Sequence, residues 1–468
     1  MHEAGFVILS MHRWQLLLLL FLSACTKDGF LNIPEARIRV SADTIRFDTV
    51  FTSAGSTYRS FQLANDYDQP IRITAIHLSG GSQSPFKLNV NGRSGTQFTN
   101  LIIDKTDSLY GWIQVNIDPN AINQPFVVRD SLLIEFNGKT QKIQLEAWGR
   151  NAHFIRNGRI TQTQTWTNDK PYVILGGLTI EPNTTLTLSP GTELYMHADA
   201  PILVRGSLRS LGEAENNRRV RIQGDRLDEP YRFFPAAWPG IYIQPGSTDN
   251  LFRFTSIKQA YQAVVVEKGA NSLLPVLRLE QCEIDNAFDA GLIGVNTSIV
   301  AENCLISNCG QNAVLIGGGN YQFTHCTMAS YANRYIDHKK PVLTVTNFSG
   351  NSTHPLQAQF TNCIFWGEGG TITDEVLLAK NSAAAFQVGF DHVLWKMQST
   401  PTLATTNQIL NNQSPGFDSI YSSNRYYDFR LGGGSPARNA GRTTPITIDL
   451  DGRPRTVGQP DLGCYEKQ

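Results

Sequence analysis

The sequence predicts an all-β fold in which a β-sandwich is followed by a parallel β-solenoid, and three observations lead to this prediction. Short segments with alternating apolar residues, separated by turn residues, fill residues 37–150. Further along, 22 residues separate Cys282 from Cys304 and Cys304 from Cys326, within one recurring phrase. Ile180 and Ile202 show the same spacing. A repeat this short cannot bury its own apolar face, so its copies have to stack on one another.

Composition supports a folded protein without an electrostatic partner. The chain has 468 residues, 41% of them hydrophobic, which is enough for the cores of two or three domains. Forty basic residues balance forty acidic ones, and only 17% of residues are charged. This balance leaves no field that would attract nucleic acid or an anionic membrane surface.

Residues 1–25 have the features of an export signal. The basic pair His12-Arg13 precedes the apolar run Leu16–Leu22, which is too short to span a hydrocarbon core of roughly 30 Å. Leu22-Ser23-Ala24-Cys25 resembles the lipobox of bacterial lipoproteins, which implies that Cys25 is lipidated and anchors the protein to a membrane. The alternative is an ordinary signal peptide with an incidental cysteine. Either Met1 or Met11 is the true start.

After a linker at residues 26–36, residues 37–150 predict an antiparallel sandwich. The strand-like segments include Arg59–Leu63, Ile71–Ile76 and Ser131–Phe136. The text from Phe51 to Asn65, followed by Pro70-Ile71-Arg72-Ile73, resembles the immunoglobulin-like domains of bacterial surface lipoproteins. This region carries no cluster of acid, base and nucleophile, so we interpret it as a spacer or interaction module.

Residues 151–425 predict the solenoid, with at least two strands on different faces in each turn. The recurring phrase is an apolar residue, a polar pair, Cys, any residue and an apolar residue, as in Leu279–Ile284, Ala301–Ile306, Phe323–Met328 and Phe360–Phe365. Ser256 and Val393 take the Cys position in flanking turns. Because the cysteines occupy equivalent positions of successive repeats, we expect buried, free thiols rather than disulfides.

The residue before each of these positions is polar, and we expect this column to hydrogen-bond along the axis and to satisfy turn backbone groups. Its members are Gln281, Asn303, His325, Asn362 and His392. From Tyr172 to Trp395 the pattern resembles right-handed parallel β-helix proteins, the architecture of pectate lyases and many bacterial adhesins. Such a resemblance implies a fold and says nothing about chemistry.

Residues 426–468 resemble the choice-of-anchor Q tail of bacterial β-helix surface proteins, through Gly434–Gly441, Asp449–Arg455 and Asp461–Glu466. One departure is Arg438-Asn439-Ala440-Gly441, where the family more often has Ile-Asp-Ala-Gly. An unpaired last turn is an aggregation-prone edge, so we expect the tail to cap the open end of the solenoid.

The best catalytic candidates lie in a basic loop and are weak: Arg334, Asp337, His338, Lys339 and Lys340. Sixteen residues separate Cys326 from Val342, against ten between Cys304 and Val314, so about six loop out of the turn. Tyr335-Ile336-Asp337-His338 is similar to a pectate-lyase phrase but is followed by Lys-Lys-Pro. The loop either binds an acidic sugar chain or, as we favour, is a solvated bulge.

Two further groups have a structural and a functional interpretation. The acids Asp285, Asp289, Asp374 and Glu375 fall between strands, and solvated turn carboxylates are the default interpretation. A long insertion carries the aromatic residues Tyr231, Phe233, Phe234 and Trp238. These aromatic rings either stack on sugar rings or cover one side of the solenoid.

No metal or cofactor is expected, with calcium as a weak alternative. Asp449-Leu450-Asp451-Gly452 resembles the start of a calcium loop, but Arg453 and Arg455 stand where further acidic ligands belong. Pairing between aspartate and arginine is the better interpretation.

Taken together, these features predict a lipid-anchored protein of the outer membrane of a Bacteroidota-like bacterium, on the periplasmic side or the cell surface. We expect a non-catalytic binding or structural role, with polysaccharide or other envelope proteins as partners. The alternative is a polysaccharide lyase or glycoside hydrolase on the outer face of the solenoid. An enzyme would gather Lys or Arg with two or more acids along a groove.

Overall fold

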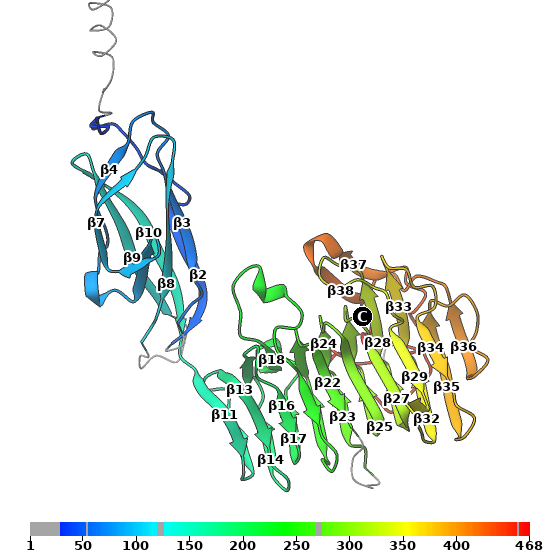
Figure 1. The fold of residues 1–468 in the computed structure, drawn as a ribbon. Helices are drawn as coiled ribbons and strands as arrows, with labels where there is room; N and C mark the ends of the chain where they lie inside the picture. Colours follow the sequence, from blue (N-terminus) through cyan, green and yellow to red (C-terminus); the bar gives the residue numbers. More distant parts are fainter. Residues whose placement is uncertain (1–28, 53–54, 119–125, 268–273, 456–457) are drawn as a thin grey trace, which may run out of the picture. The chain divides into compact units, whose positions relative to one another are not determined.

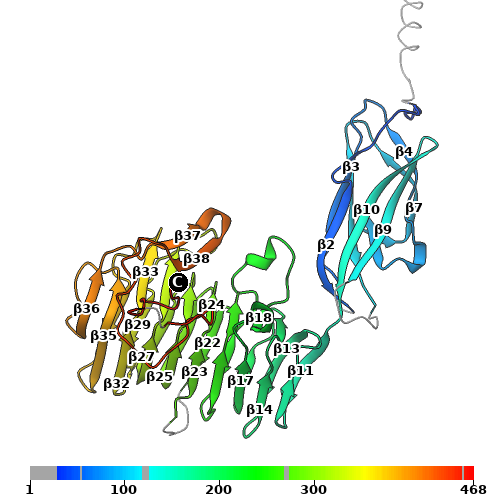
Figure 2. The same ribbon diagram turned by 180° about the vertical axis from the view of Figure 1, so that it is seen from behind.

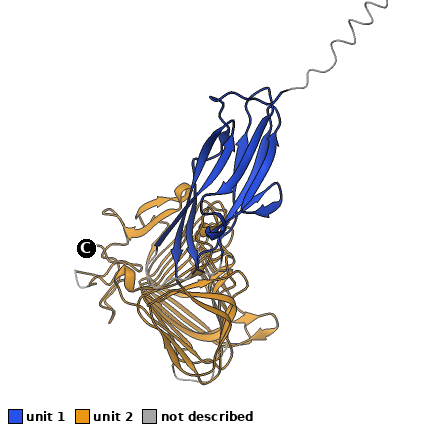
Figure 3. Cartoon of the chain, turned by 90° about the vertical axis from the view of Figure 1, so that its left-hand side faces the viewer, with its two compact units in different colours: residues 1–151 blue, residues 152–468 orange. Residues whose placement is uncertain are grey.

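The computed structural model describes residues 29–52, 55–118, 126–267, 274–455 and 458–468. The predicted lipid-attachment residue, Cys25, lies outside these ranges. The chain divides into two compact units, residues 1–151 and 152–468 (Figure 3). No helix in the described part of the chain is long and apolar enough to cross a membrane.

Unit 1 contains two five-stranded sheets that share one hydrophobic core. One sheet has the order β1-β3-β8-β5-β6 and the other β2-β10-β9-β4-β7. The elements are β1 (Arg39–Val40), β2 (Thr44–Phe51), β3 (Arg59–Ala64), β4 (Ile71–Leu78), η1 (Gly81–Gln83), β5 (Phe86–Val90), β6 (Arg93–Gly95), β7 (Gln97–Ile103), β8 (Ser108–Val115), β9 (Phe126–Phe136) and β10 (Lys139–Arg150). One pair, β2 with β10, is parallel, so the sheets are not purely antiparallel as predicted. These two strands are far apart in sequence, and no tight turn forces them to be antiparallel.

Unit 2 is built around a 24-stranded sheet in which every strand pairing is parallel (Figure 1). Its strands are β11 (His153–Ile160), β12 (Gln164–Trp166), β13 (Tyr172–Ile180), β14 (Thr185–Leu188), β15 (Glu193–Met196), β16 (Ile202–Val204), β17 (Ser207–Leu211), β18 (Val220–Gly224), β19 (Ile241–Ile243), β20 (Asn250–Arg253), β21 (Thr255–Lys258), β22 (Gln262–Val266), β23 (Leu277–Glu280), β24 (Glu283–Asp285), β25 (Ala290–Glu302), β26 (Leu305–Ser307), β27 (Ala313–Thr324), β28 (Thr327–Tyr331), β29 (Leu343–Thr346), β32 (Leu356–Thr361), β33 (Ile364–Glu368), β34 (Val376–Ala379), β35 (Phe386–Trp395) and β36 (Thr405–Asn411). From β13 to β22 each strand pairs with the third strand after it. The chain therefore winds in successive turns, or rungs, of three strands each.

Shorter elements decorate this stack. They are η2 (Asn216–Arg218), η3 (Tyr231–Phe233), η4 (Ser422–Asn424), the hairpin β30 (Phe348–Ser349) with β31 (Ser352–Thr353), and the hairpin β37 (Phe417–Tyr421) with β38 (Tyr426–Leu431). The loop between β18 and β19 and the β37–β38 hairpin rise from the same side of the stack in Figures 1 and 2.

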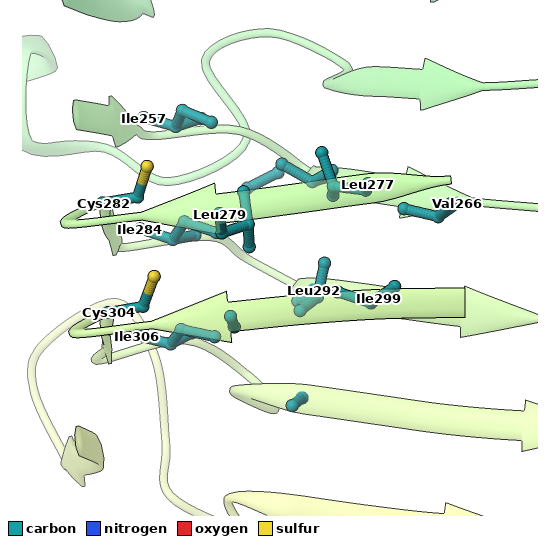
Figure 4. Packing of buried hydrophobic residues seen from close by; sticks show 14 of the residues in the cluster. Ile257, Val266, Leu277, Leu279, Cys282, Ile284, Leu292, Ile299, Cys304 and Ile306 are labelled. Atoms are coloured by element: carbon teal, nitrogen blue, oxygen red, sulfur yellow. The ribbon is translucent and has the colours of Figure 1, made fainter. Parts of the chain in front are cut away.

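The inside of the stack consists of columns of equivalent residues. Phe323, Phe360 and Phe390 stack with ring centroids 5.3 and 4.9 Å apart. Cys282 and Cys304 lie on adjacent rungs and point the same way (Figure 4). All six cysteines of the described residues are free and buried, which confirms the prediction of buried thiols.

A turn precedes each cysteine and explains the polar column. Gln281, Asn303, His325, Asn362 and His392 all have left-handed backbone conformations, with φ between 51° and 55°. Asn tolerates this region better than most residues, and its side chain bonds nearby backbone groups. The expected hydrogen bonding along the axis holds for one pair, because Asn362 Nδ2 lies 3.0 Å from His325 Nε2.

We had expected the tail to cover the open end of the stack, but it lies along the side of the stack. Arg442 pairs with Asp391 at 2.8 Å, Asn303 Nδ2 donates to the Ile448 carbonyl at 2.8 Å, and Arg219 donates to the Leu450 carbonyl. The physical reason is a set of apolar side chains on the outside of neighbouring rungs, which need cover. With the tail they form a second core that includes Leu305, Ala329, Ile364, Leu394, Phe429, Leu431, Leu450, Leu462 and Cys464.

The last rung ends the stack differently. Thr406 occupies the position that Phe390 holds one rung earlier, and it is exposed. A polar residue at the inward position lets the open end of the core face water at a small cost.

Candidate functional site

The aromatic insertion and the basic loop, which carry the candidates predicted from the sequence, meet in the structure. Phe234, from the insertion before β19, packs on Tyr335 of the basic loop with ring centroids 4.9 Å apart. Arg425, between η4 and β38, lies with its guanidinium 4.4 Å from the ring centroids of both Phe233 and Tyr335. Its Nη2 donates to the Tyr335 hydroxyl at 2.7 Å. Three insertions far apart in sequence are thus joined by cation–π contacts.

This junction leaves few aromatic faces free for a sugar. The guanidinium of Arg226 lies 3.8 Å from the centroid of Tyr231, the most exposed of the four predicted residues. Trp238 is only 1% exposed, belongs to the inner core and donates its Nε1–H to the Lys258 carbonyl at 2.9 Å. Trp238 is therefore a core residue and not part of a surface site.

A buried pair fixes the basic loop to the stack. His338 and Glu375 have side chains 2% and 0% exposed, and 2.8 Å separates His338 Nε2 from Glu375 Oε1. Glu375 Oε2 also accepts the Val342 N–H at 3.3 Å. The interpretation of Glu375 as a solvated turn carboxylate is therefore wrong. Strand β34 begins at the next residue, and its position in the stack places the Glu375 side chain beneath the basic loop. A side chain on Gly367 would collide with both members of the pair.

The remaining loop residues point to solvent and form separate pairs. Lys339 pairs with Asp337 at 2.5 Å, with both side chains about two-thirds exposed. The guanidinium of Arg334, an exposed residue, lies over the Tyr335 ring, 6.0 Å from its centroid. Lys340 reaches Asp289, with 3.6 Å between Nζ and Oδ1. Within the described residues, the loop therefore contacts two carboxylates of other segments: the partly exposed Asp289 and the buried Glu375.

An aromatic pair that we did not predict lies next to Asp289. Tyr261 and Phe288 are 45% and 48% exposed, and their nearly parallel rings have centroids 5.9 Å apart. They occupy equivalent positions on adjacent rungs, each after an alanine that points into the core, Ala260 or Ala287. We call these two residues the aromatic platform.

The platform ends at the next rung. Gly310 follows Cys309 as Phe288 follows Ala287, and a Cβ on Gly310 would collide with the Phe288 carbonyl oxygen. The column therefore has no third ring, and no side chain at position 310 covers Phe288. The repeated text Ala-Tyr-Gln, Ala-Phe-Asp and Cys-Gly-Gln at residues 260–262, 287–289 and 309–311 would have revealed this arrangement.

Polar side chains border the platform. Gln262 Nε2 donates to Asp289 Oδ2 at 2.8 Å, and Lys340 approaches the other oxygen of the same carboxylate. Gln311 Nε2 donates to Thr344 Oγ1 at 3.0 Å. Amide, carboxylate and ammonium groups beside exposed rings can hydrogen-bond the hydroxyl groups of a sugar while its C–H face packs on an aromatic ring.

The aspartates of the tail serve the tail itself. Asp449 Oδ1 accepts the N–H groups of Asp451 and Arg453 at 2.9 and 2.7 Å, and burial raises the pKa of this carboxyl group. Asp451 pairs with Arg430 at 2.8 Å. In the part of the chain that the structure describes, no group of three or more His, Cys, Asp or Glu side chains is arranged to hold a metal ion.

Comparisons with known proteins identify no family. No family model and no curated protein matches the chain. Among solved structures, a family 123 glycoside hydrolase from Clostridium perfringens is similar over 25% of this chain at 11% identity and a TM-score of 0.18, and the match spans 30% of the hydrolase chain. The ASH/PapD-like domain 7 of human CEP192 is similar over 27% of this chain and 96% of that domain, at 12% identity and a TM-score of 0.17. The fold itself defines the class: an all-β protein with a long, all-parallel sheet.

Proposed function

We propose that this protein is a lipid-anchored, non-catalytic glycan-binding protein of the bacterial cell envelope. In this proposal unit 2 is a right-handed parallel β-helix that carries the binding face, and unit 1 is an immunoglobulin-like spacer that follows the lipidated Cys25 in the sequence. The single observation that supports it best is the aromatic platform, Tyr261 with Phe288, bordered by Asp289, Gln262 and Lys340.

The platform has the chemistry that sugar recognition requires. A pyranose ring has an apolar C–H face and a polar edge, so it fits an aromatic ring with hydrogen-bonding groups beside it. Half of the Phe288 surface is exposed, and position 310 provides no side chain to cover it. A sugar ring on Phe288 would have Asp289 and Lys340 within reach of its hydroxyl groups.

The charges favour binding over cleavage. Glycosidases place two carboxyl groups roughly 5–10 Å apart on either side of the scissile bond. Beside the platform, Asp289 is already engaged by Gln262 and Lys340, and Glu375 is sealed beneath Gly367 and the basic loop. Asp289 and Glu375 therefore give the platform a polar border, but they do not form a pair of accessible carboxyl groups on either side of a bound sugar chain.

Binding is tested by titrating the mature protein with neutral and acidic oligosaccharides and measuring the affinity by calorimetry. Removing the Phe288 ring should cost about 2 kcal/mol, or roughly 30-fold in Kd, which is the value of burying one aromatic side chain. Phe288→Ala and Tyr261→Ala should therefore weaken binding, and Tyr231→Ala should not. Equal affinity in all three variants would refute the platform as the binding site.

Two further assays test for catalysis and for the lipid anchor. Release of unsaturated or reducing ends by the wild type, abolished in Lys339→Ala or Lys340→Ala, would overturn the non-catalytic assignment in favour of a lyase or hydrolase. Expression in a Gram-negative host with labelled palmitate should label the wild type and leave Cys25→Ala unlabelled.

A further inference from the structure

A cavity beneath the β37–β38 hairpin has a composition unlike that of the aromatic platform. Its volume is about 380 Å³, and we call it the hairpin cavity. Tyr331 and Glu368 form its floor, as register partners on the adjacent strands β28 and β33. The hairpin and the segment before it supply Ser414, Phe417, Ile420 and Ser422.

Glu368 is an exposed residue that brings to this cavity a negative charge without an ion-pair partner among the described residues. Its Oε1 accepts the Trp366 Nε1–H at 2.8 Å, which holds the carboxylate in place without neutralising it. Across the described ranges, no lysine, arginine or histidine side chain forms an ion pair with Glu368, and none lines the cavity. By contrast, Asp428 of the hairpin strand β38 forms an ion pair with Arg430 at 3.1 Å.

The other groups of the cavity are aromatic, aliphatic or uncharged. Burial, together with the negative charge of Glu368, raises the pKa of Tyr331, so its phenol stays neutral at physiological pH. Phe417 and Ile420 add apolar surface, and two serine hydroxyls add uncharged hydrogen-bonding groups. An anion would be repelled here, and an apolar ligand would strip water from the carboxylate without replacing it.

A small organic cation complements the carboxylate and the aromatic side chains of this cavity. An ammonium group with N–H donates charge-assisted hydrogen bonds to a carboxylate, and ammonium groups of either kind, quaternary ones included, are attracted to a carboxylate and to aromatic rings. We propose that the hairpin cavity binds a small molecule that carries an ammonium group, with Glu368 as its counter-ion. This site is separate from the aromatic platform and does not depend on the proposed glycan binding.

Calorimetric titration of the intact mature protein tests this proposal with matched probes. Ethanolamine, choline and glucosamine carry the charge, and 3,3-dimethylbutan-1-ol and N-acetylglucosamine are the uncharged counterparts of the last two. At least one charged probe should bind, and choline or glucosamine should bind at least tenfold more tightly than its uncharged counterpart. Glu368→Gln should weaken that binding at least tenfold, because it removes the charge and keeps an acceptor for Trp366.

Asp418→Asn is the matched control, since Asp418 is an exposed carboxylate of β37 that does not line the cavity. It should leave the affinity unchanged, and thermal unfolding should show that both variants keep the wild-type fold. Binding that is equal for charged and uncharged probes, or equal in wild type and Glu368→Gln, would overturn the proposal. So would the absence of binding by all three ammonium probes at millimolar concentration.

Discussion

Arg455 should determine whether the tail stays on the stack. Arg455 and Glu466 pair at 2.9 Å with side chains only 1% exposed. The same guanidinium donates to Asn303 Oδ1 through Nε at 2.9 Å and Nη2 at 2.7 Å, and to the Gly463 carbonyl at 2.9 Å. One side chain thus joins both ends of the tail's last loop to a rung 152 residues earlier.

The expected cost of removing this guanidinium follows from its burial. Arg455→Met keeps most of the volume but leaves the buried Glu466 carboxylate without its countercharge and Asn303 Oδ1 without the guanidinium donors. Breaking a buried ion pair in this way costs about 3–5 kcal/mol. The control is Arg453→Ala, two residues away. The Arg453 side chain is 51% exposed, and its ion pair with Asp451 is long, at 4.0 Å. Exposed pairs of that kind contribute less than about 1 kcal/mol.

Hydrogen exchange measures this difference where it arises. The Leu450 N–H bonds the Cys464 carbonyl at 2.9 Å, and the Cys464 N–H bonds Thr327 Oγ1 at 3.1 Å, so both amides report detachment of the tail. In Arg455→Met their exchange should accelerate by roughly 100-fold or more, the equivalent of about 3 kcal/mol. Similar exchange rates in Arg455→Met and Arg453→Ala would refute the assignment of Arg455 as the buried anchor.

Three more predictions concern unit 2. Burial, together with the nearby charge of Arg455, lowers the pKa of His325 well below its usual 6.5. The contribution of the neutral, buried imidazole to stability is therefore complete above pH 6.5 and is lost as pH falls below that value. The free energy of unfolding in urea should differ less between pH 5 and pH 7 for His325→Asn than for the wild type, and an equal difference would contradict this. Burial raises the pKa of the Cys309 and Cys464 thiols, so a thiol reagent should label neither in the native protein and both in denaturant, as mass spectrometry of labelled peptides will show. Gly367→Ala should lower the unfolding free energy by at least about 2 kcal/mol in urea titration, since its methyl group displaces His338 or Glu375, whereas Gly433→Ala, in open space, should be neutral.

The repeat was predictable because equivalent positions in successive rungs have the same buried environment and therefore favour the same residue type. Cys282, Cys304 and Cys326 fill equal spaces in successive rungs, and the period of 22 residues follows from the length of one turn. The polar residue before each cysteine was also recognised, although its left-handed backbone conformation, φ 51° at Asn303, was not foreseen.

The side contacts were not predictable, because no local pattern encodes them. Nothing in the text around Glu375 indicates that His338, 37 residues earlier, would bury it. Arg425 stacks on Tyr335 across 90 residues and on Phe233 from a third segment. The aromatic platform was missed for another reason: Tyr261 and Phe288 are 27 residues apart, outside the 22-residue period that we followed.

The course of the tail restricts how this solenoid can change. A solenoid with free ends can gain or lose a rung without strain elsewhere, because each repeat contacts only its neighbours. Here residues 442–450 meet Asp391, Asn303 and Arg219 in turn, on rungs that lie progressively nearer the start of the stack. A duplicated or deleted rung would put the later contacts of the tail out of register, so the number of rungs and the length of the tail have to change together.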